Sequence, residues 1–365
     1  MKKVLNFVKN EIVLVISFVL ASVSCFIVTP DKSYIEYIDF KTLVLLFCLM
    51  AVTSGLGSMG VFRVLAEKML KRVKSFSLLS LTLCLLCFFS SMLITNDVAL
   101  ITFVPFTLII LNMINKKEKA IILVTLETVA ANLGSMATPI GNPQNLYLFS
   151  KYEMSMGDFF SAILPYAFLS LVLVVVCSLF LGKEKIEINT EKTEFGFNIK
   201  IIIYAVLFVL SLLSVFRVVD YRILLAVSVV SVLICDRKTF RNIDYSLLLT
   251  FVFLFVFIGN LGRIEIISEF LRNTVSGREI MTGIISSQVF SNVPAAILLS
   301  NFTDNVKDLL IGVNLGGLGT LIASMASLIS FKLIQKEKVN TGKYMLVFTL
   351  VNIAFLGANL LLTIV

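Results

Sequence analysis

The sequence predicts an all-α polytopic membrane protein made of two inverted repeats, each with a re-entrant helical hairpin and a broken transmembrane helix. Apolar residues make up 58% of the 365-residue chain and charged residues only 15%, whereas in soluble domains about a quarter of the residues are charged. The apolar residues form runs long enough to cross a membrane. Polar and glycine motifs inside these runs recur in the same order in both halves, and this recurrence predicts the repeats.

The basic net charge of +8 does not indicate a nucleic-acid partner. Lys and Arg lie in short clusters between apolar runs, which is the pattern that sets membrane topology. The six cysteines fall inside or at the ends of apolar runs, so we expect buried thiols rather than disulfides or a metal site. The leftover loops are too short for a soluble domain, and the sequence predicts one membrane domain.

Nine apolar runs are expected to span the membrane. They cover residues 11–29, 41–60, 119–146, 159–182, 200–218, 222–235, 245–262, 309–333 and 342–364. Two further apolar segments, 75–115 and 279–301, are each interrupted by a polar tip, and we expect each to form a helical hairpin. The runs at 119–146 and 309–333 carry the predicted broken helices.

Basic residues flank both ends of the 75–115 hairpin, so both ends are expected in the cytoplasm. Two full spans joined by a tight outer turn would satisfy the same charges. Re-entry is favoured because the tip Thr95-Asn96-Asp97 leads straight into apolar sequence without outer loop residues. Irregular backbone at membrane depth is tolerated only where protein or water covers it.

Alternating sides from an inside N-terminus places most of the 31 Lys and Arg residues in the cytoplasm and the C-terminus outside. The N-terminal half (1–182) then holds the first span and repeat 1, and the C-terminal half (201–365) holds repeat 2. The segment 183–200 is the cytoplasmic linker. We expect a multi-pass protein of the cytoplasmic membrane.

Two motifs support the repeat. Ser-Ser-x-x-x-Thr/Ser-Asn-x-x-Ala-x-Ile occurs at 90–101 and 286–297, and Asn-Leu-Gly-x-x-x-Thr-x-Ile occurs at 132–140 and 314–322. The second span runs inward and the seventh outward in this topology, so the repeats are inverted, which is a signature of secondary transporters.

The stretch 132–145 is expected to unwind. Pro139 and Pro143 each remove a backbone donor, and Gly134 and Gly141 each cost about 1 kcal/mol relative to alanine. Freed carbonyls can coordinate a cation, and a half-helix N-terminus can hold an anion. The partner segment 314–327 should break in the same way, although glycines at such spacing also serve close helix packing.

Asp97 is the most informative single residue, because an ionised Asp at the membrane centre costs roughly 2.5 to 3.5 kcal/mol unless it is paired or hydrated. We expect it to meet a cation, either sodium or a proton; the alternative is a cap on the second hairpin arm. Glu127, also inside a span, is either a proton or cation carrier or a residue near the cytoplasmic water level.

Lys and Arg are absent from the tips and breaks. An anionic substrate would therefore depend on hydroxyls, amides, helix dipoles and co-bound cations. The candidate substrate-binding residues are Thr95, Asn96, Thr138, Pro139, Asn142, Ser291, Asn292 and Thr320. The candidate cation ligands are Asn96, Asp97, Asn132, Gly134, Asn292, Asn314 and Gly316.

At these residues the chain resembles the ion transporter superfamily of divalent anion/sodium symporters, arsenite permeases, citrate/metal carriers and one group of sodium/proton antiporters. The tips 95–97 and 291–293 occupy the places of the symporters' paired Ser-Asn-Thr motifs, and 138–143 looks like their unwound helix. The resemblance implies a homodimer of scaffold and transport domains, an elevator motion, and sodium sites between each hairpin and its broken helix. Asp97 and Val293 replace the third-position Thr, which looks closer to the arsenite permease and antiporter branches.

The expected function is secondary transport of a small anion, a carboxylate or an inorganic oxyanion, coupled to sodium. The alternative is arsenite efflux or sodium/proton exchange centred on Asp97. A membrane enzyme is disfavoured because the chain has no His and no carboxylate pair in the breaks; a passive channel gains less from inverted symmetry. Sodium is the expected cofactor, with no organic one, and membrane lipid surrounds the protein.

Overall fold

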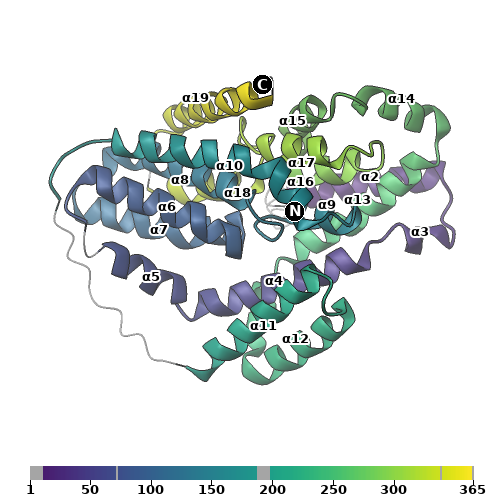
Figure 1. Cartoon of the computed structure of the whole chain (residues 1–365), viewed down its shortest axis with the longest axis horizontal. Helices are drawn as coiled ribbons and strands as arrows, with labels where there is room; N and C mark the ends of the chain where they lie inside the picture. Colours follow the sequence, from purple (N-terminus) through teal and green to yellow (C-terminus); the bar gives the residue numbers. More distant parts are fainter. Residues whose placement is uncertain (1–10, 71–72, 187–197, 338, 364–365) are drawn as a thin grey trace, which may run out of the picture.

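The computed structural model describes residues 11–70, 73–186, 198–337 and 339–363, and it is helical throughout except for one isolated bridge between Ser75 and Lys185 (Figure 1). Six helices are long and apolar enough to cross a membrane. They are α4 (Phe40–Ser58), α6 (Phe76–Ile94), α7 (Asn96–Met113), α10 (Met156–Leu179), α13 (Tyr245–Gly262) and α19 (Thr341–Leu360). The described chain is thus an all-helical polytopic membrane protein, as the composition predicts.

The remaining helices are shorter. Four of them are apolar: α2 (Ile12–Ile27), α11 (Ile199–Val215), α12 (Tyr221–Cys235) and α18 (Met325–Gln335). The others are α3 (Ser33–Glu36), α5 (Val61–Leu70), α8 (Ala120–Ser135), α9 (Pro143–Lys151), α14 (Glu265–Val275), α15 (Glu279–Phe290), α16 (Asn292–Leu299) and α17 (Val306–Leu315). Three 3-10 turns, η1 (Lys117–Lys119), η2 (Arg237–Asn242) and η3 (Leu361–Thr363), complete the described helical segments.

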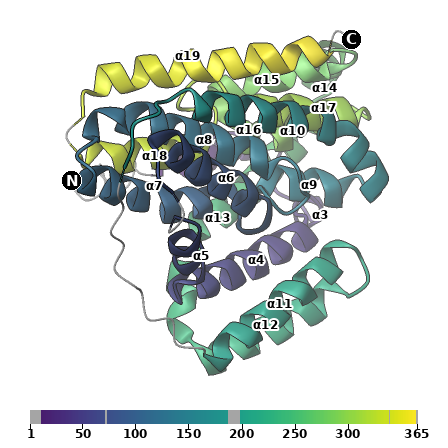
Figure 2. The ribbon, with the colours of Figure 1, turned by 60° about the vertical axis from the view of Figure 1, so that its left-hand side comes forward.

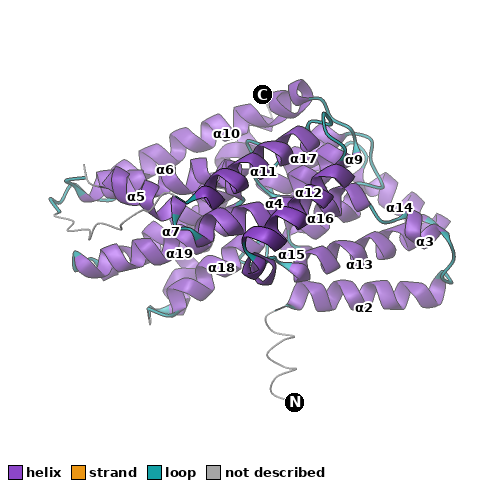
Figure 3. Ribbon diagram, turned by 90° about the horizontal axis from the view of Figure 1, so that it is seen from below, coloured by secondary structure: helices purple, strands orange, loops and turns teal. Residues whose placement is uncertain are grey.

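The two sequence halves exchange helices. The first span, α2, packs against α13 of the second half (Figure 3), while α11 and α12 of the second half pack against α4 of the first (Figure 2). A glycine allows the contact of α11 with α4, since a Cβ on Gly55 would lie 2.2 Å from the Tyr204 ring. Gly259 of α13 makes room in the same way for Tyr37, the C-cap residue of α3, because a Cβ there would lie 2.3 Å from the Tyr37 ring. The predicted boundaries at 182 and 200 therefore divide the sequence but do not separate two bundles.

Each predicted hairpin is a pair of antiparallel helices joined by one residue. Thr95 joins α6 to α7 with φ 70° and ψ 153°, and Ser291 joins α15 to α16 with φ 73° and ψ 154°. Positive φ is uncommon for a residue with a side chain and most unusual for a β-branched one. The arms are 19 and 18 residues long in the first pair but 12 and 8 in the second.

Both predicted broken helices are interrupted where glycine and proline accumulate. The first consists of α8 and α9 with an unwound segment at 136–142, and the second of α17 and α18 with an unwound segment at 316–324. The predicted range 119–146 ended the first too early, since α9 continues to Lys151, whose ammonium group donates hydrogen bonds to Ser300 and Asn301. The second predicted range, 309–333, is short by a few residues at each end.

Helix α8 lies at the centre of the molecule. Nearly every one of its side chains is buried, including the polar Glu127 and Asn132. The helices α6, α7, α10, α18 and α19 pack around it, as seen in Figure 1. The break that follows α8 is therefore held inside the bundle rather than at its surface.

Candidate functional site

The first hairpin tip contacts the first break directly. The backbone N–H of Asn96 donates to the carbonyl of Gly141 at 3.3 Å, and its side-chain amide donates to Asn132 Oδ1 at 2.9 Å. From the break, the hydroxyl of Thr138 donates to the carbonyl of Met92 at 2.5 Å. Asn132 and Thr138 belong to the repeat motif, and Gly141 directly follows it.

The second tip repeats this arrangement with its own break. The backbone N–H of Asn292 donates to the carbonyl of Ala323 at 3.0 Å. Gly141 and Ala323 each lie three residues after the threonine of the recurring motif, Thr138 or Thr320. The same backbone hydrogen bond therefore joins tip to break in both halves.

The two breaks also contact each other, and their contacts are reciprocal. The amide of Asn142 donates to Asn314 Oδ1 at 3.0 Å, and the amide of Asn314 donates to Asn145 Oδ1 at 2.7 Å.

On the other side, Asn132 accepts from the hydroxyl of Ser324 at 3.1 Å and donates to Ser327 at 3.3 Å. Ser324 and Ser327 stand in the second repeat where Asn142 and Asn145 stand in the first. Each motif asparagine therefore forms hydrogen bonds with the last residue of the opposite repeat's break and with the first turn of the helix that follows it.

A cavity of about 280 Å³ opens beside the first tip, and we call it the tip cavity. Thr95, Asp97, Asn142 and Pro143 border it, so the N-termini of α7 and α9 both lie at its wall. Among the described residues that line it, acidic ones outnumber basic ones three to one: the charged lining residues are Glu11, Asp97, Asp244 and Lys332. Among the described residues, the carboxylate of Asp97 forms no hydrogen bond or ion pair.

A second cavity, of about 530 Å³, lies at the other ends of α4 and α13. One wall is the strap, defined as residues 28–39, through Glu36, Tyr37 and Asp39; another is the end of α9 with Lys151. We call it the strap cavity. Its five charged lining residues are Glu36, Asp39, Lys41, Lys151 and Glu153.

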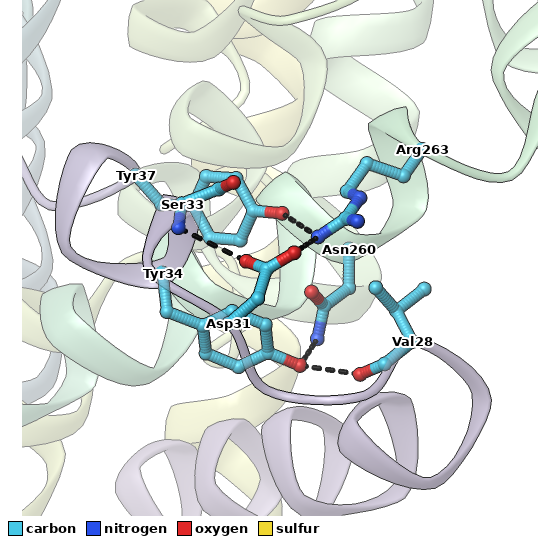
Figure 4. Close-up of polar contacts among 7 residues, drawn as sticks. All are labelled: Val28, Asp31, Ser33, Tyr34, Tyr37, Asn260 and Arg263. Atoms are coloured by element: carbon cyan, nitrogen blue, oxygen red, sulfur yellow. Dashed lines mark hydrogen bonds and ion pairs between the residues drawn. The ribbon is translucent and has the colours of Figure 1, made fainter.

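The strap is fastened to the end of α13, as Figure 4 shows. Arg263 forms an ion pair with Asp31 at 2.8 Å and also donates to the hydroxyl of Tyr37 at 3.2 Å. Asn260 donates to the hydroxyl of Tyr34 at 2.8 Å. The guanidinium group of Arg263 holds the pKa of Asp31 below its ordinary value by hydrogen bonding to the carboxylate.

The two cavities are lined by equivalent positions of the two repeats. Asp39 caps α4 and Asp244 caps α13 with the same backbone angles, φ −78° and ψ 84°. Asp39 lines the strap cavity and Asp244 lines the tip cavity.

The residues eleven, fourteen and fifteen positions after each aspartate are also divided between the two cavities, but each set lines the cavity that its own aspartate does not line. They are Met50, Thr53 and Ser54 in the tip cavity and Phe255, Ile258 and Gly259 in the strap cavity. Ile101 and Ile297, equivalent in the hairpin motif, are also divided between the two cavities.

The predicted site residues are only partly assembled in one place. Asn96, Asn132, Asn142 and Asn314 form the buried network, and Pro139 is buried beside Thr138 in the break. The remaining predicted residues of the second repeat, Ser291, Asn292 and Thr320, do not line the tip cavity.

The two predicted glycine ligands have a packing role. A Cβ on Gly134 would lie 2.2 Å from the carbonyl oxygen of Phe88, and one on Gly316 would lie 2.5 Å from the hydroxyl oxygen of Ser287. The carbonyl of Gly316 accepts a hydrogen bond from Gln288 at 2.9 Å. Both glycines let a broken helix approach its hairpin closely.

Sequence reasoning missed several residues at the site. In the sequence, Asp39 and Asp244 mark only the start of a span in each repeat, and Asn145, Ser324 and Ser327 do not stand out. Extending the alignment of the motif threonines a few residues further would have paired Asn142 with Ser324 and Asn145 with Ser327.

The sequence is similar to those of known membrane transporters. The model of a family described as citrate transporter, CitMHS, matches residues 5–308. The chain is 35% identical over 322 residues to an uncharacterized transporter of Methanocaldococcus jannaschii, covering 88% of each chain. It is 28% identical over 320 residues to the inner membrane protein YbiR of Escherichia coli K12, covering 87% of this chain and 86% of the other.

The fold is similar to a solved transporter. The crystal structure of the Alcanivorax borkumensis YdaH transporter superposes with a TM-score of 0.58 over 91% of this chain and 87% of the other, at 11% identity. At that identity the likeness concerns the fold alone. Because the family model covers most of the sequence, the chain belongs to the CitMHS citrate transporter family of the ion transporter superfamily, a family of membrane transporters and not of enzymes.

Proposed function

We propose that this protein is a secondary active transporter of the cytoplasmic membrane that moves a small anion, a carboxylate or an inorganic oxyanion, together with sodium. The mechanism is elevator-type alternating access in a homodimer embedded in lipid. One observation carries the proposal: equivalent positions of two repeats line two cavities at opposite ends of α4 and α13.

Such paired cavities are what alternating access requires. A carrier built from inverted repeats has two states in which the repeats exchange conformations, so each position in one pathway has a counterpart in the other. The tip cavity opens where α13 begins, the side that the Lys and Arg distribution predicts to be cytoplasmic. The structure then represents an inward-facing state, with the strap cavity as the outer vestibule.

The moving part in this proposal contains both re-entrant hairpins and both broken helices, which are joined by the buried asparagine network. The fixed scaffold contains α2, α4, α11, α12 and α13. The elements of the moving part hold one another through side-chain hydrogen bonds such as Asn96 to Asn132 and Asn142 to Asn314. A rigid unit of this kind can move past the scaffold without losing its substrate site.

The tip cavity supports anion binding only with help from cations. The N-termini of α7 and α9 at its wall attract negative charge. The excess of acidic residues opposes it. Sodium bound at the first tip through Asn96, Asp97 and Asn132 would offset that excess, and a second, weaker site would use Asn292 and Asn314.

The acidic excess also favours the alternative function. A cavity in which three acidic residues face one lysine suits a cation better than an anion. Sodium/proton exchange or arsenite efflux centred on Asp97 is therefore the second candidate. Citrate is the first anion to test, because the family model is described as a citrate transporter.

Uptake of labelled citrate into proteoliposomes under a sodium gradient tests the proposal. The variants are Asp97→Asn and, as a matched control, Asp244→Asn, which removes a carboxylate from the same cavity but keeps a helix-capping side chain. Saturable, sodium-dependent uptake by the wild-type protein supports anion symport, and Asp97→Asn should then raise the sodium concentration that uptake requires, because one proposed sodium ligand loses its charge. Uptake that persists in this variant excludes exchange on Asp97. Sodium-driven proton movement that Asp97→Asn alone abolishes, without citrate uptake, supports the alternative. Uptake that neither saturates nor depends on a counterion contradicts both.

A further inference from the structure

Glu127 is a buried carboxyl group that the proposed substrate site does not use. It lies in the middle of α8 with no exposed surface, so protein atoms and not solvent surround its carboxyl group. Its Oε1 atom accepts a hydrogen bond from the hydroxyl of Thr107 on α7. Its Oε2 atom has no hydrogen-bond partner, and no Lys or Arg pairs with it, within the part of the chain that the structure describes.

Among the described residues, no positively charged group acts on Glu127 to balance an ionised carboxylate. The titratable groups facing it are the thiols of Cys84 and Cys87 on α6 and the phenol of Tyr344 on α19. Thr107 on α7 donates a hydrogen bond to Glu127, and Ser330 on α18 accepts one from the next residue, Thr128. On α10, Ser178 and Cys177 lie beside Cys84. An unpaired buried carboxylate costs several kcal/mol, so this carboxyl group holds a proton in the observed conformation.

Glu127 sits at the junction of the parts that form the substrate site. Thr107 belongs to the second arm of the first hairpin, so the Thr107–Glu127 hydrogen bond ties that hairpin to α8. The next residue, Thr128, donates to Ser330 of the second broken helix at 2.8 Å. Five residues further along α8, Asn132 accepts the hydrogen bond from the tip residue Asn96.

Loss of the proton would therefore act on the site. It would leave a negative charge between α7 and α8 with one hydroxyl donor. The energetic cost of this buried charge falls when the two helices separate and water reaches the carboxylate. Separation of α7 from α8 would loosen the contact between Asn96 and Asn132. Tyr344, whose hydroxyl is also buried without a hydrogen-bond partner among the described residues, is a candidate second donor.

We propose that Glu127 is a proton-binding site linked to the substrate site, so that each transport cycle binds and releases one proton there in addition to the ions at the first tip. The step is balanced: the carboxylate takes up one proton to form the acid, and no other bond changes. Substrate affinity rises as pH falls, by up to about tenfold per pH unit, the limit for one linked proton. This inference rests on the proposed transport function.

A measurement that needs no substrate tests the proton itself. Infrared spectra of the purified protein at neutral pH should contain the carbonyl stretch of a buried carboxylic acid, which Glu127→Gln removes. Glu279→Gln is the matched control, because Glu279 is also buried with one unpartnered oxygen among the described residues. Glu279 differs in that it accepts hydrogen bonds from Gly277 and Thr303 and lies in the first turn of α15, where the helix dipole stabilises a negative charge. The band should persist in this control. A wild-type protein without the band would overturn the proposal.

The linkage is tested by citrate uptake into proteoliposomes as a function of pH. Glu127→Gln should keep uptake but lose its pH dependence, and Glu279→Gln should retain the wild-type profile. A Glu127→Gln variant with the wild-type pH profile would overturn the proposal. If that variant does not fold, Thr107→Val serves instead: it removes the donor and should shift both the infrared band and the pH profile, and an unchanged profile would again contradict the linkage. Wild-type protein without citrate uptake at any pH would count against the proposed substrate, while the infrared band would still decide whether Glu127 carries a proton.

Discussion

Asn142 of the first broken helix donates a 3.0 Å hydrogen bond to Asn314 of the second, and both side chains are buried. The bond joins residues 172 positions apart in the sequence. Its counterpart across the repeat joins Asn132 to Ser324. The two breaks are therefore interlocked, and the site depends on both repeats at once.

Removing either asparagine of this pair should destabilise the protein. Asn142→Ala or Asn314→Ala leaves a buried polar partner unpaired, which costs about 1 to 3 kcal/mol. The double variant should cost less than the sum, with a coupling of roughly 0.5 to 3 kcal/mol. Unfolding of the four proteins in detergent measures it. Asn352→Ala is the control, because within the described part of the chain the Asn352 amide bonds only to its own helix, at Phe348. Strict additivity of Asn142→Ala and Asn314→Ala would refute the interlock.

Gly134 should tolerate no side chain. A Cβ there would lie 2.2 Å from a backbone oxygen of α6, so Gly134→Ala must push α8 away from the hairpin, at a cost of about 1 to 3 kcal/mol. Gly357→Ala is the matched control, since no atom of the described residues lies within 4 Å of the position that a Cβ on Gly357 would take. Replacing glycine by alanine in an exposed helix interior raises the stability of the protein by about 1 kcal/mol. Thermal unfolding of both variants checks the difference. Equal melting temperatures would show that α8 and α6 are not in close contact.

The strap should loosen in acid. The pKa of Asp31 is lowered by Arg263, so the ion pair contributes stability above the ordinary aspartate pKa and loses it as pH falls through the lowered value. Hydrogen exchange of residues 28–39 should therefore accelerate at strongly acidic pH. Asp31→Asn should accelerate it already at neutral pH.

The charge-swapped pair Asp31→Arg with Arg263→Asp should restore slow exchange in the strap. Asp158→Asn, which breaks a comparable exposed ion pair with Lys307, should leave the strap unchanged. Strap exchange that is insensitive to Asp31→Asn would mean that the ion pair does not fasten it.

Much of the local structure follows from the sequence. The sequence predicts Thr95 and Ser291 at hairpin tips, and the pair of prolines with Gly134 and Gly141 predicts the unwound segment after α8. These features depend on short-range backbone chemistry, which a sequence motif records directly. The predicted end of α9 is too early because Lys151 looks like a loop residue, and its partners Ser300 and Asn301 are far away in the chain.

The long-range arrangement could not be predicted in the same way. The packing of α11 on α4 depends on Gly55 leaving room for the Tyr204 ring, and the packing of the strap on α13 depends on Gly259 leaving room for the Tyr37 ring. No local pattern marks such pairs. Asp39 and Asp244 appear in the sequence only as helix starts, and their position in two cavities follows from the exchange of helices between the halves.

Alternating exposure of the two cavities tests the account most directly. Thr53→Cys in the tip cavity and Ile258→Cys in the strap cavity occupy equivalent positions. Each is labelled with a membrane-impermeant thiol reagent from either side, in a background where the half-buried Cys25, Cys177 and Cys235 are serine. We expect conditions that protect one cysteine, such as sodium with citrate, to expose the other. The cysteine in the tip cavity should react from the cytoplasmic side and the one in the strap cavity from the outer side. Cysteines that both react regardless of sodium and citrate, or from the same side, would contradict alternating access.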